Sequence, residues 1–349
     1  METKYFAVDH QHPDPNILAA AAAIIAQGGL VAFPTETVYG LGANGLDTEA
    51  VTRIFQAKGR PADNPLILHI ASTEDVNNLA EQISANAKVL MDKFWPGPLT
   101  VVLQRKSCIP DVVTGGLDTV ALRLPDSLIA REIIKRSGCP IAAPSANVSG
   151  RPSPTTAAAV MADLVGKIDA VVDGGACTIG VESTVVDCTT VVPTLLRPGG
   201  ITLEMLEETL GEIEIDHSLA QSEAIPRSPG MKYVHYAPIA PMILVEGSGE
   251  ALAEAIGTLV CDALREGKKV GAAVSAETAA LLPATATVAV YGNRGDVSAA
   301  AANLYEVLRS FDKTDVDIIY GEGISEQGLG LAVMNRLRKA SGYRSVQAK

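Results

Sequence analysis

The sequence predicts an α/β protein: a larger part with a mixed sheet, followed by a smaller part with a parallel sheet. Helical and strand patterns alternate from residue 16 to 203, and a regular strand–helix repeat begins at Met242. At 349 residues and 47% hydrophobic residues, the chain can bury two cores. Aromatic residues make up only 4%, so Ala, Val, Leu and Ile must fill those cores.

The elements of the larger part follow from periodicity and from helix start and stop signals. Ile17–Gln27 reads as an Ala-rich helix ended by Gly28 and Gly29, and 47–58 reads as a helix with Asp47 or Thr48 as its N-cap. Two further helices are expected: one that Ser72 opens, with Asp75 three residues later, and one over 85–94. The expected strands are 30–33, 66–70, 99–103, 120–124, 141–143, 170–172 and 184–187.

The pattern loosens between residues 204 and 240. Acidic residues accumulate up to Asp216, and three prolines follow between Ile225 and Pro238. We therefore predict a first domain over 1–207, a linker over 208–240 and a second domain over 241–349. The second domain is expected to have Rossmann-like winding, with strands 242–247, 270–275, 287–292 and 317–321 and helices 249–266, 276–282, 297–311 and from about 331.

Two glycine pairs in the second domain lack the spacing of a dinucleotide site. Gly321 with Gly323, and Gly328 with Gly330, do not form G-x-G-x-x-G after a first strand. No Walker A motif occurs in the sequence. We read no dinucleotide site at these glycines.

Charge and cysteine content narrow the class of protein. The net charge is −12, and residues 1–200 carry 15 basic against 20 acidic side chains, so tight nucleic-acid binding is not expected. The apolar run 17–26 is too short for a membrane span and lacks a basic flank, so no signal peptide or membrane helix is expected. Five cysteines without metal-ligand spacing indicate reduced, buried thiols in a cytoplasmic protein, with no side-chain cluster for a metal.

Lys58 and Arg60 form the first candidate site. They lie at a helix end just ahead of an apolar strand, and Pro61 and Pro65 fix the backbone on either side of the turn. A solvated pair of surface charges is the alternative. Two cations presented by a rigid turn suit a polyphosphate, and neither side chain is expected to lie in a core.

A second candidate site lies at strand ends. The strand of Leu30–Pro34 runs into polar residues that begin at Thr35, where α/β folds place ligands. Arg123 lies on an apolar strand, so its guanidinium should have an anionic partner, either a structural Asp or Glu or a substrate carboxylate. His69, alone on an apolar strand, would by itself be read as a core histidine.

Seven ordered motifs resemble those of the Sua5/YrdC family, in its long two-domain Sua5 form. They are PTETVYGLG from residue 34, KGRPADNPLILHI from 58, WPGPLTVVL from 95, ALRLP from 121, PSANVSGRPSPT from 144, ESTVVD from 182 and LLRPGG from 195. The resemblance implies a YrdC-like open twisted mixed sheet and a Sua5 C-terminal domain. It also implies an enzyme that makes threonylcarbamoyl-AMP and pyrophosphate from L-threonine, bicarbonate and ATP with Mg²⁺, for N6-threonylcarbamoyladenosine in tRNA. Transient contact with the tRNA threonylcarbamoyl transferase machinery is expected.

The resemblance also implies a role for each matching residue. Lys58 and Arg60 would be catalytic, the linker would act as an active-site lid, and Arg123 would hold the threonine carboxylate. The implied ATP-binding residues are Lys58, Arg60, Asn64, Thr119, Ser145, Asn147, Ser153, Arg197 and Tyr236, and the implied threonine-binding residues are Thr35, His69, Arg123, Ala143 and Ser183.

Two other classes of function stay open. A protein of YrdC fold could be an RNA-binding module without turnover, although the negative charge argues against high affinity. Carbamoyl transfer, as in hydrogenase-maturation relatives, would bring acylphosphatase and zinc-finger segments, and the sequence has neither.

Overall fold

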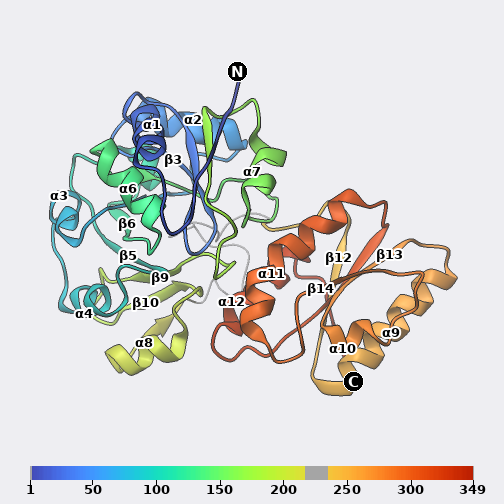
Figure 1. The fold of residues 1–349 in the computed structure, drawn as a ribbon. Helices are drawn as coiled ribbons and strands as arrows, with labels where there is room; N and C mark the ends of the chain where they lie inside the picture. The colour runs from blue at the N-terminus through green and yellow to red at the C-terminus, as the bar shows by residue number, and fades with distance from the viewer. Residues whose placement is uncertain (1, 217–234, 349) are drawn as a thin grey trace. The chain divides into compact units, whose positions relative to one another are not determined.

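The computed structural model describes residues 2–216 and 235–348, and they fall into two compact units (Figure 1). The described part of the first unit comprises residues 2–149, 153–178 and 182–216, and that of the second comprises 150–152, 179–181 and 235–348. The predicted α/β class is confirmed. Our boundaries at residues 207 and 240 stay a prediction, and the predicted linker lies partly outside the described residues.

The first unit is built on an eleven-stranded mixed sheet in the order β1-β8-β2-β3-β7-β4-β6-β5-β9-β10-β11. Both parallel and antiparallel pairs occur along it, so the predicted mixed sheet is confirmed. Its strands are β1 (Lys4–Ala7), β2 (Val31–Pro34), β3 (Tyr39–Asn44), β4 (Ile67–His69), β5 (Leu99–Gln104), β6 (Thr119–Arg123), β7 (Ile141–Ala142), β8 (Ala170–Asp173), β9 (Thr184–Asp187), β10 (Thr194–Arg197) and β11 (Glu214–Ile215).

Local capping explains where the helices of the first unit begin. Asp14 caps α1 and precedes a proline at the first helical position, so α1 begins two residues before the predicted start. Asp47 caps α2 through the N–H groups of residues 49 and 50, and Gly59 ends it in the left-handed conformation. The helices are α1 (Pro15–Ala26), α2 (Thr48–Lys58), α3 (Val76–Leu79), α4 (Ala85–Phe94), α5 (Asp111–Thr114), α6 (Leu128–Ser137), α7 (Ala157–Leu164) and α8 (Leu203–Leu210).

Several elements differ from the expectation. The pattern at residue 72 predicted one helix, whereas a 3₁₀ turn at Thr73–Asp75 leads into the short α3. The acid-rich stretch after residue 203 is not irregular, because α8 buries Leu206 and β11 pairs in parallel with β10. Its polar residues reflect one exposed helix face, which composition alone does not separate from a loop.

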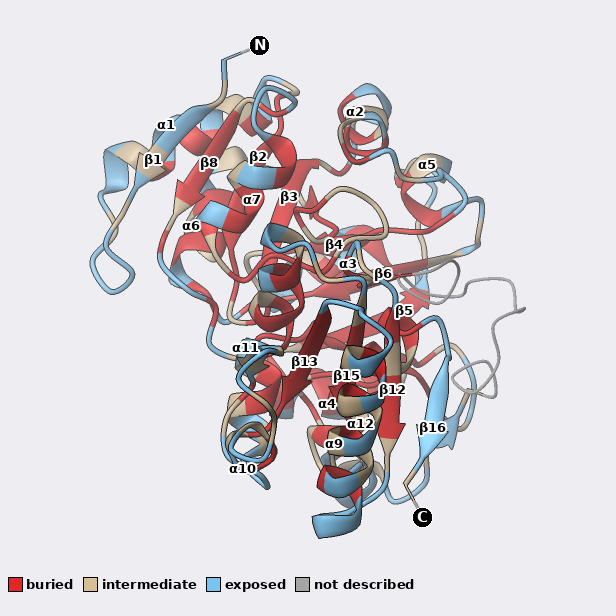
Figure 2. Cartoon of the chain, turned by 90° about the vertical axis from the view of Figure 1, so that its right-hand side faces the viewer, coloured by how far each residue is buried: buried red, intermediate tan, exposed pale blue. Residues whose placement is uncertain are grey.

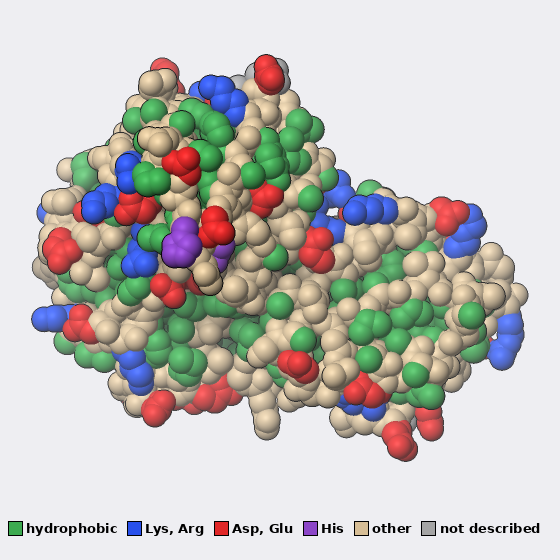
Figure 3. Space-filling view, viewed as in Figure 1, with side chains coloured by type: hydrophobic (Ala, Val, Ile, Leu, Met, Phe, Trp, Pro, Cys, Tyr) green, Lys and Arg blue, Asp and Glu red, His purple; other side chains and the backbone are tan. Residues whose placement is uncertain are grey.

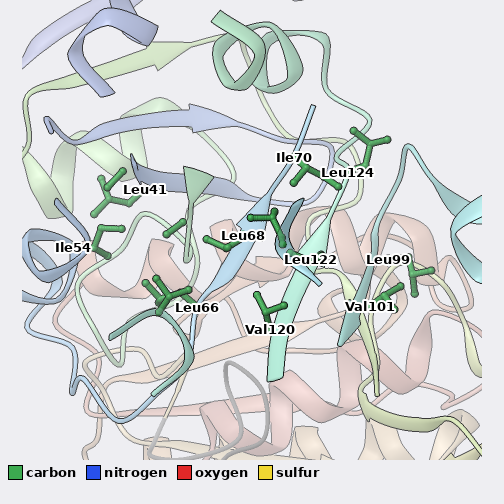
Figure 4. Packing of buried hydrophobic residues seen from close by; sticks show 14 of the residues in the cluster. Leu41, Ile54, Leu66, Leu68, Ile70, Leu99, Val101, Val120, Leu122 and Leu124 are labelled. Carbon is green, nitrogen blue, oxygen red and sulfur yellow. The ribbon is translucent and has the colours of Figure 1, made fainter. Parts of the chain in front are cut away.

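The main core of the first unit lies against one face of the sheet. Leu68 of β4, Val101 of β5, and Val120 and Leu122 of β6 are buried there together with Ile54 of α2 (Figure 4). Because side chains alternate along a strand, Thr119, Ala121 and Arg123 of β6 point to the opposite face. Figure 2 shows these central strands as mostly buried. The opposite face is the one that carries the polar residues described below.

The second unit is a five-stranded, fully parallel sheet in the order β14-β13-β15-β12-β16, so the predicted Rossmann-like winding is confirmed. Helices α9 and α10 lie on one face, and α11 and α12 pack together on the other (Figure 1). The strands are β12 (Met242–Glu246), β13 (Val270–Val274), β14 (Thr287–Val290), β15 (Ile318–Glu322) and β16 (Ser345–Gln347); the helices are α9 (Gly249–Arg265), α10 (Ala276–Ala279), α11 (Val297–Ser310) and α12 (Gly330–Ala340).

Two global expectations concern membranes and cysteines. Within residues 2–216 and 235–348, no helix combines the length and the apolar character needed to cross a membrane. All five cysteines are free thiols. Cys177 and Cys188 are buried as expected, but Cys108 is exposed, so the expectation of buried thiols is wrong for that residue.

Candidate active site

Arg123 ends β6 on the face opposite the main core, and it has an acidic partner. Its Nη2 donates to Glu36 Oε1 at 2.6 Å, and its side chain is 4% exposed. Glu36 also accepts from the backbone N–H of Asp126 through Oε2 at 3.1 Å, so it ties the loop after β2 to the loop after β6. Of the two partners left open by the sequence, the protein supplies the structural one. The remaining N–H groups of the guanidinium can still donate to a second carboxylate.

His69 ends β4 directly beside Arg123, because the two residues are paired in the parallel register of β4 and β6. Burial, with the positive charge of Arg123 as the second cause, lowers the pKa of His69 from 6.5 to about 3. The imidazole is therefore neutral at ordinary pH. Among the described residues, its Nδ1 has no hydrogen-bond partner, so a neutral acceptor or donor lies next to a buried cation. His69 therefore differs from a core histidine whose two ring nitrogens are both hydrogen-bonded.

The pKa of His69 predicts a pH dependence of stability. Since the folded-state pKa lies below the value of an unfolded chain, the unfolded state binds one more proton between about pH 6.5 and 3. Over that window His69 should lower the free energy of unfolding by about 1.4 kcal/mol per pH unit as the pH falls. Urea unfolding of wild type and His69→Gln at pH 7.5, 6 and 5 measures it. Equal acid sensitivity of both proteins would contradict the lowered pKa.

The Glu36–Arg123 pair predicts a ligand-dependent stability. Glu36→Ala leaves a buried guanidinium without its carboxylate, which should cost about 3–5 kcal/mol of unfolding free energy. If threonine's carboxylate binds Arg123, threonine should restore part of that loss and raise the Tm of the variant more than that of wild type. Thermal unfolding with and without threonine tests this, and Glu132→Ala, which removes an exposed ion pair with Arg136, is the matched control. A smaller threonine shift in Glu36→Ala than in wild type would oppose it.

Ser183 and Arg197 form a second cluster, with Thr100 of β5. Arg197 ends β10 and donates from Nε to the backbone oxygen of Ser183 at 3.0 Å and from Nη2 to Ser183 Oγ at 3.1 Å. Ser183 Oγ also lies 2.7 Å from Thr100 Oγ1. A residue expected to bind threonine and one expected to bind ATP therefore share a hydrogen-bond network, because Ser183 comes directly before β9 and Arg197 ends its antiparallel neighbour.

Lys58 is placed differently from the expectation. Its side chain is 1% exposed, and its ammonium donates to the backbone carbonyls of Ser145 and Asn147. The expectation that Lys58 lies outside any core is wrong, because the helix end tucks the side chain under the loop after β7. Lys58 thereby fixes the loop that carries the hydroxyl of Ser145 and the amide of Asn147, which bond each other at 2.6 Å.

Arg60 and Asn64 belong to the turn after α2. Arg60 Nη2 donates to the carbonyl of Pro65 at 3.2 Å, so the guanidinium folds back over its own turn. Asn64 is 1% exposed, and its Oδ1 has no hydrogen-bond partner among the described residues. A buried acceptor without a donor is costly, so this oxygen is suited to a ligand N–H or hydroxyl.

The remaining expected residues of the first unit are distributed around these clusters. Thr35 is buried and donates to the carbonyl of Val38 at 2.7 Å, and the N–H of Ala143 donates to Ile67 at 3.1 Å. Ser153 is fully buried and donates to Glu182 at 2.6 Å. Thr119 begins β6 on the same face as Arg123, about 13 Å along the strand from it. The two ends of β6 could thus contact different parts of a long ligand.

Tyr236, the remaining expected ATP-binding residue, belongs to the second unit. It is a buried non-glycine residue with φ of +66°, and its ring stacks on Tyr305 with centroids 5.4 Å apart. Such a backbone costs free energy that its surroundings must offset. The segment 217–234 of the predicted lid lies outside the described residues, so contact between Tyr236 and a nucleotide stays a prediction.

Sequence reasoning missed three side chains that this geometry makes prominent: Glu36, Thr100 and Glu182. Each lies in one of the seven motifs. Glu36 and Glu182 directly follow or precede the candidates Thr35 and Ser183, whereas the motif that contains Thr100 supplied no candidate. The signal for Glu36 was present, because a buried Arg123 demands a carboxylate and Glu36 follows a strand end next to Thr35. Nothing in the sequence pairs Ser153 with Glu182.

Across residues 2–216 and 235–348, no group of three His, Cys, Asp or Glu side chains is arranged to hold a metal ion. A cation that arrives with a polyphosphate would need few protein ligands. The Ser145 hydroxyl and the Asn147 amide oxygen are hard oxygen ligands, the type that Mg²⁺ prefers. The residues present therefore fit a nucleotide-borne Mg²⁺.

Comparison with known proteins shows the family to which the chain belongs. The model of the Sua5, YciO and YrdC domain, described as telomere recombination, matches residues 23–199, and that of the threonylcarbamoyl-AMP synthase C-terminal domain matches 201–342. The chain is 53% identical over 328 residues to threonylcarbamoyl-AMP synthase of Pyrococcus abyssi, covering 94% of each chain. It is 48% identical to the Bacillus subtilis protein of that name, covering 99% of this chain and 100% of the other. The chain belongs to the Sua5/YrdC family, in its two-domain form.

A solved structure agrees over the whole length. Pyrococcus abyssi Sua5 complexed with L-threonine matches with a TM-score of 0.95 at 50% identity, covering 99% of this chain and 100% of that one. The YciO protein of Escherichia coli matches at a TM-score of 0.52 and 22% identity over 56% of this chain, which is a likeness of fold alone.

Proposed function

We propose that the protein is a threonylcarbamoyl-AMP synthase. The observation that carries the proposal is similarity over nearly the full chain to enzymes of that name, together with the TM-score of 0.95 to a threonine complex. In this reaction the threonine amine and bicarbonate form a carbamate and water. A carbamate oxygen then attacks the α-phosphorus of ATP, and pyrophosphate leaves.

The pair of Arg123 and His69 is the best candidate for the threonine site. A guanidinium that is 4% exposed can hold the substrate carboxylate, and neutral His69 offers Nδ1 to the amine or hydroxyl. Thr35, Ser183 and the backbone at Ala143 complete the proposed threonine contacts. Because His69 is neutral, it does not repel the substrate ammonium.

The proposed nucleotide site uses the residues at the end of α2 and in the loop after β7. Arg60 and Asn64 would contact phosphates, while Lys58 holds the loop of Ser145 and Asn147 in place. Mg²⁺ would arrive with ATP and neutralise phosphate charge. Nucleotidyl transfer needs positioning and charge stabilisation rather than a protein nucleophile, so these groups suffice. Ser153, Thr119 and Arg197 are proposed to contact the remainder of ATP.

The test is release of pyrophosphate by the full chain with each substrate omitted in turn. We expect release only when threonine, bicarbonate and ATP are all present, with one threonylcarbamoyl-AMP formed per pyrophosphate. Equal release without threonine would identify a different nucleotidase or transferase activity. Omission of Mg²⁺ should stop the reaction, which also tests the proposed metal.

The RNA-binding alternative makes a different prediction. Acidic and basic side chains are interspersed on the face seen in Figure 3, which is unlike the continuous basic stripe of tight RNA binders. Salt-sensitive RNA binding without pyrophosphate release would favour that alternative.

We also propose that the protein works in the cytoplasm and passes its product to the tRNA threonylcarbamoyl transferase machinery, because a mixed anhydride of this kind hydrolyses readily.

A further inference from the structure

The second unit contains a cavity of about 330 Å³ at the carboxyl ends of its parallel strands. Its walls come from the segments that follow each of four strands: 247–249 after β12, Ser275 after β13, 291–297 after β14, and 322–325 at the end of β15. Small-molecule sites typically have volumes of about 300–1,000 Å³. The cavity is therefore large enough for one compact ligand.

The strand order puts this cavity at a topological switch point. Neighbouring strands β12 and β15 are followed by α9 and α12, which lie on opposite faces of the sheet (Figure 1). The two connections diverge and leave a crevice between the strand ends. In open α/β sheets, ligands bind in such a crevice.

One wall of the cavity suits an anion. Helix α9 has 17 residues and begins beside the cavity at Gly249, and Ser248 at its N-cap makes no side-chain capping hydrogen bond. The N-cap residues of α10 and α11 do make one. Arg294 lines the same cavity. Its Nη2 donates to Thr278 Oγ1 at 3.0 Å. A cavity lined by both a long helix N-terminus and a guanidinium is suited to a phosphate.

A second wall offers a buried carboxylate. Glu322 is 3% exposed and accepts hydrogen bonds from the N–H of Ser275 at 2.7 Å and from its hydroxyl at 3.1 Å. Arg294 Nε lies 3.7 Å from Glu322 Oε1. A carboxylate has about four lone-pair sites, so capacity remains for a ligand hydroxyl. Leu252, Val297 and Ala300 add an apolar lining.

We propose that this cavity binds a nucleoside monophosphate. The phosphate lies at the N-terminus of α9 with Arg294, the ribose hydroxyls bond Glu322, and the base packs on Leu252 and Val297. A dinucleotide does not fit, because the third glycine position, counted from Gly247 and Gly249, is the buried Leu252. This inference concerns a different unit from the proposed catalytic site and does not depend on it.

The test is hydrogen exchange of the full chain, read by peptide, with AMP, adenosine or inorganic phosphate. AMP at about ten times its Kd should slow amide exchange about tenfold in peptides covering 247–253 and 322–326. This holds for amides that exchange only when the cavity opens and the ligand leaves. Ser248→Asp places a carboxylate at the anion position and is an equally good N-cap, so it should abolish this protection without lowering Tm. Arg294→Met should weaken it, whereas Arg265→Met, at an exposed ion pair on α9, should not.

Unchanged exchange in both peptides with millimolar AMP would overturn the proposal. So would full protection in both Ser248→Asp and Arg294→Met. Equal protection by inorganic phosphate alone would overturn the nucleoside assignment, and equal protection by adenosine alone would overturn the placement of the phosphate. If Ser248→Asp lowers Tm, Arg294→Met decides. The Arg294 side chain is 35% exposed but donates to Thr278 Oγ1 at 3.0 Å, so the exchange of this variant with AMP is compared with that of the same variant without AMP.

Discussion

Replacing Lys58 with methionine should lower the rate of pyrophosphate release by about 100-fold, the loss expected when groups that position a substrate are displaced by about 1 Å. Methionine keeps the length of the side chain but removes the ammonium that bonds the carbonyls of Ser145 and Asn147. These carbonyls, one buried and one partly buried, lose a donor, which should also cost about 1–3 kcal/mol of unfolding free energy. Steady-state kinetics well below the Tm of the variant measure the first effect, and urea unfolding measures the second.

Lys88→Met is the matched control, because Lys88 is an exposed lysine on α4. It should change neither rate nor stability appreciably. If Lys58→Met is destabilised but retains near-normal turnover, Lys58 has a structural role only, and Arg60 must carry the charge stabilisation.

Replacing Arg123 with lysine should raise the KM for threonine by about 10–100-fold and leave the KM for ATP within about threefold of wild type. One ammonium cannot reproduce the guanidinium's parallel bonds to a carboxylate while also satisfying Glu36. A hydrogen bond to a charged group is worth about 1.5–3 kcal/mol, which sets that range. The measurement is initial rate against each substrate at saturating levels of the others.

Arg136→Lys is the control, since Arg136 pairs with Glu132 on the exposed surface of α6. It should leave both KM values unchanged. A rise in the KM for ATP rather than threonine in Arg123→Lys would assign the guanidinium to the nucleotide.

Much of the fold was predictable where local signals are strong. Helix α4 and strand β9 begin and end where the periodicity predicts, because a Ser84 cap and a run of β-branched residues mark them. Strand β3 was missed because its residues, from Tyr39 to Asn44, include two glycines and follow a polar turn. It exists through pairing with β2, which no local pattern encodes.

The site was predictable by residue type but not by partner. The sequence singles out Arg123 and requires an anion beside it, yet only the fold brings Glu36 to it across 87 residues of chain. The burial of Lys58 could not be predicted from its neighbours in sequence either, because the loop that covers it follows β7, almost 90 residues later in the chain. Contacts between residues far apart in the chain produce no periodic pattern in a single sequence, so they cannot be predicted from it.

The position of β1 at the edge of the sheet has a consequence for synthesis on the ribosome. β1 comprises the first described strand of the chain, but its only ladder partner among the described strands is β8, at Ala170–Asp173. At translation rates of about 5–20 residues per second, β1 waits roughly 10 to 30 s as an unpaired strand. Its sequence tolerates the delay, because Lys4 places a charge on the edge and three of its four residues remain exposed even after folding.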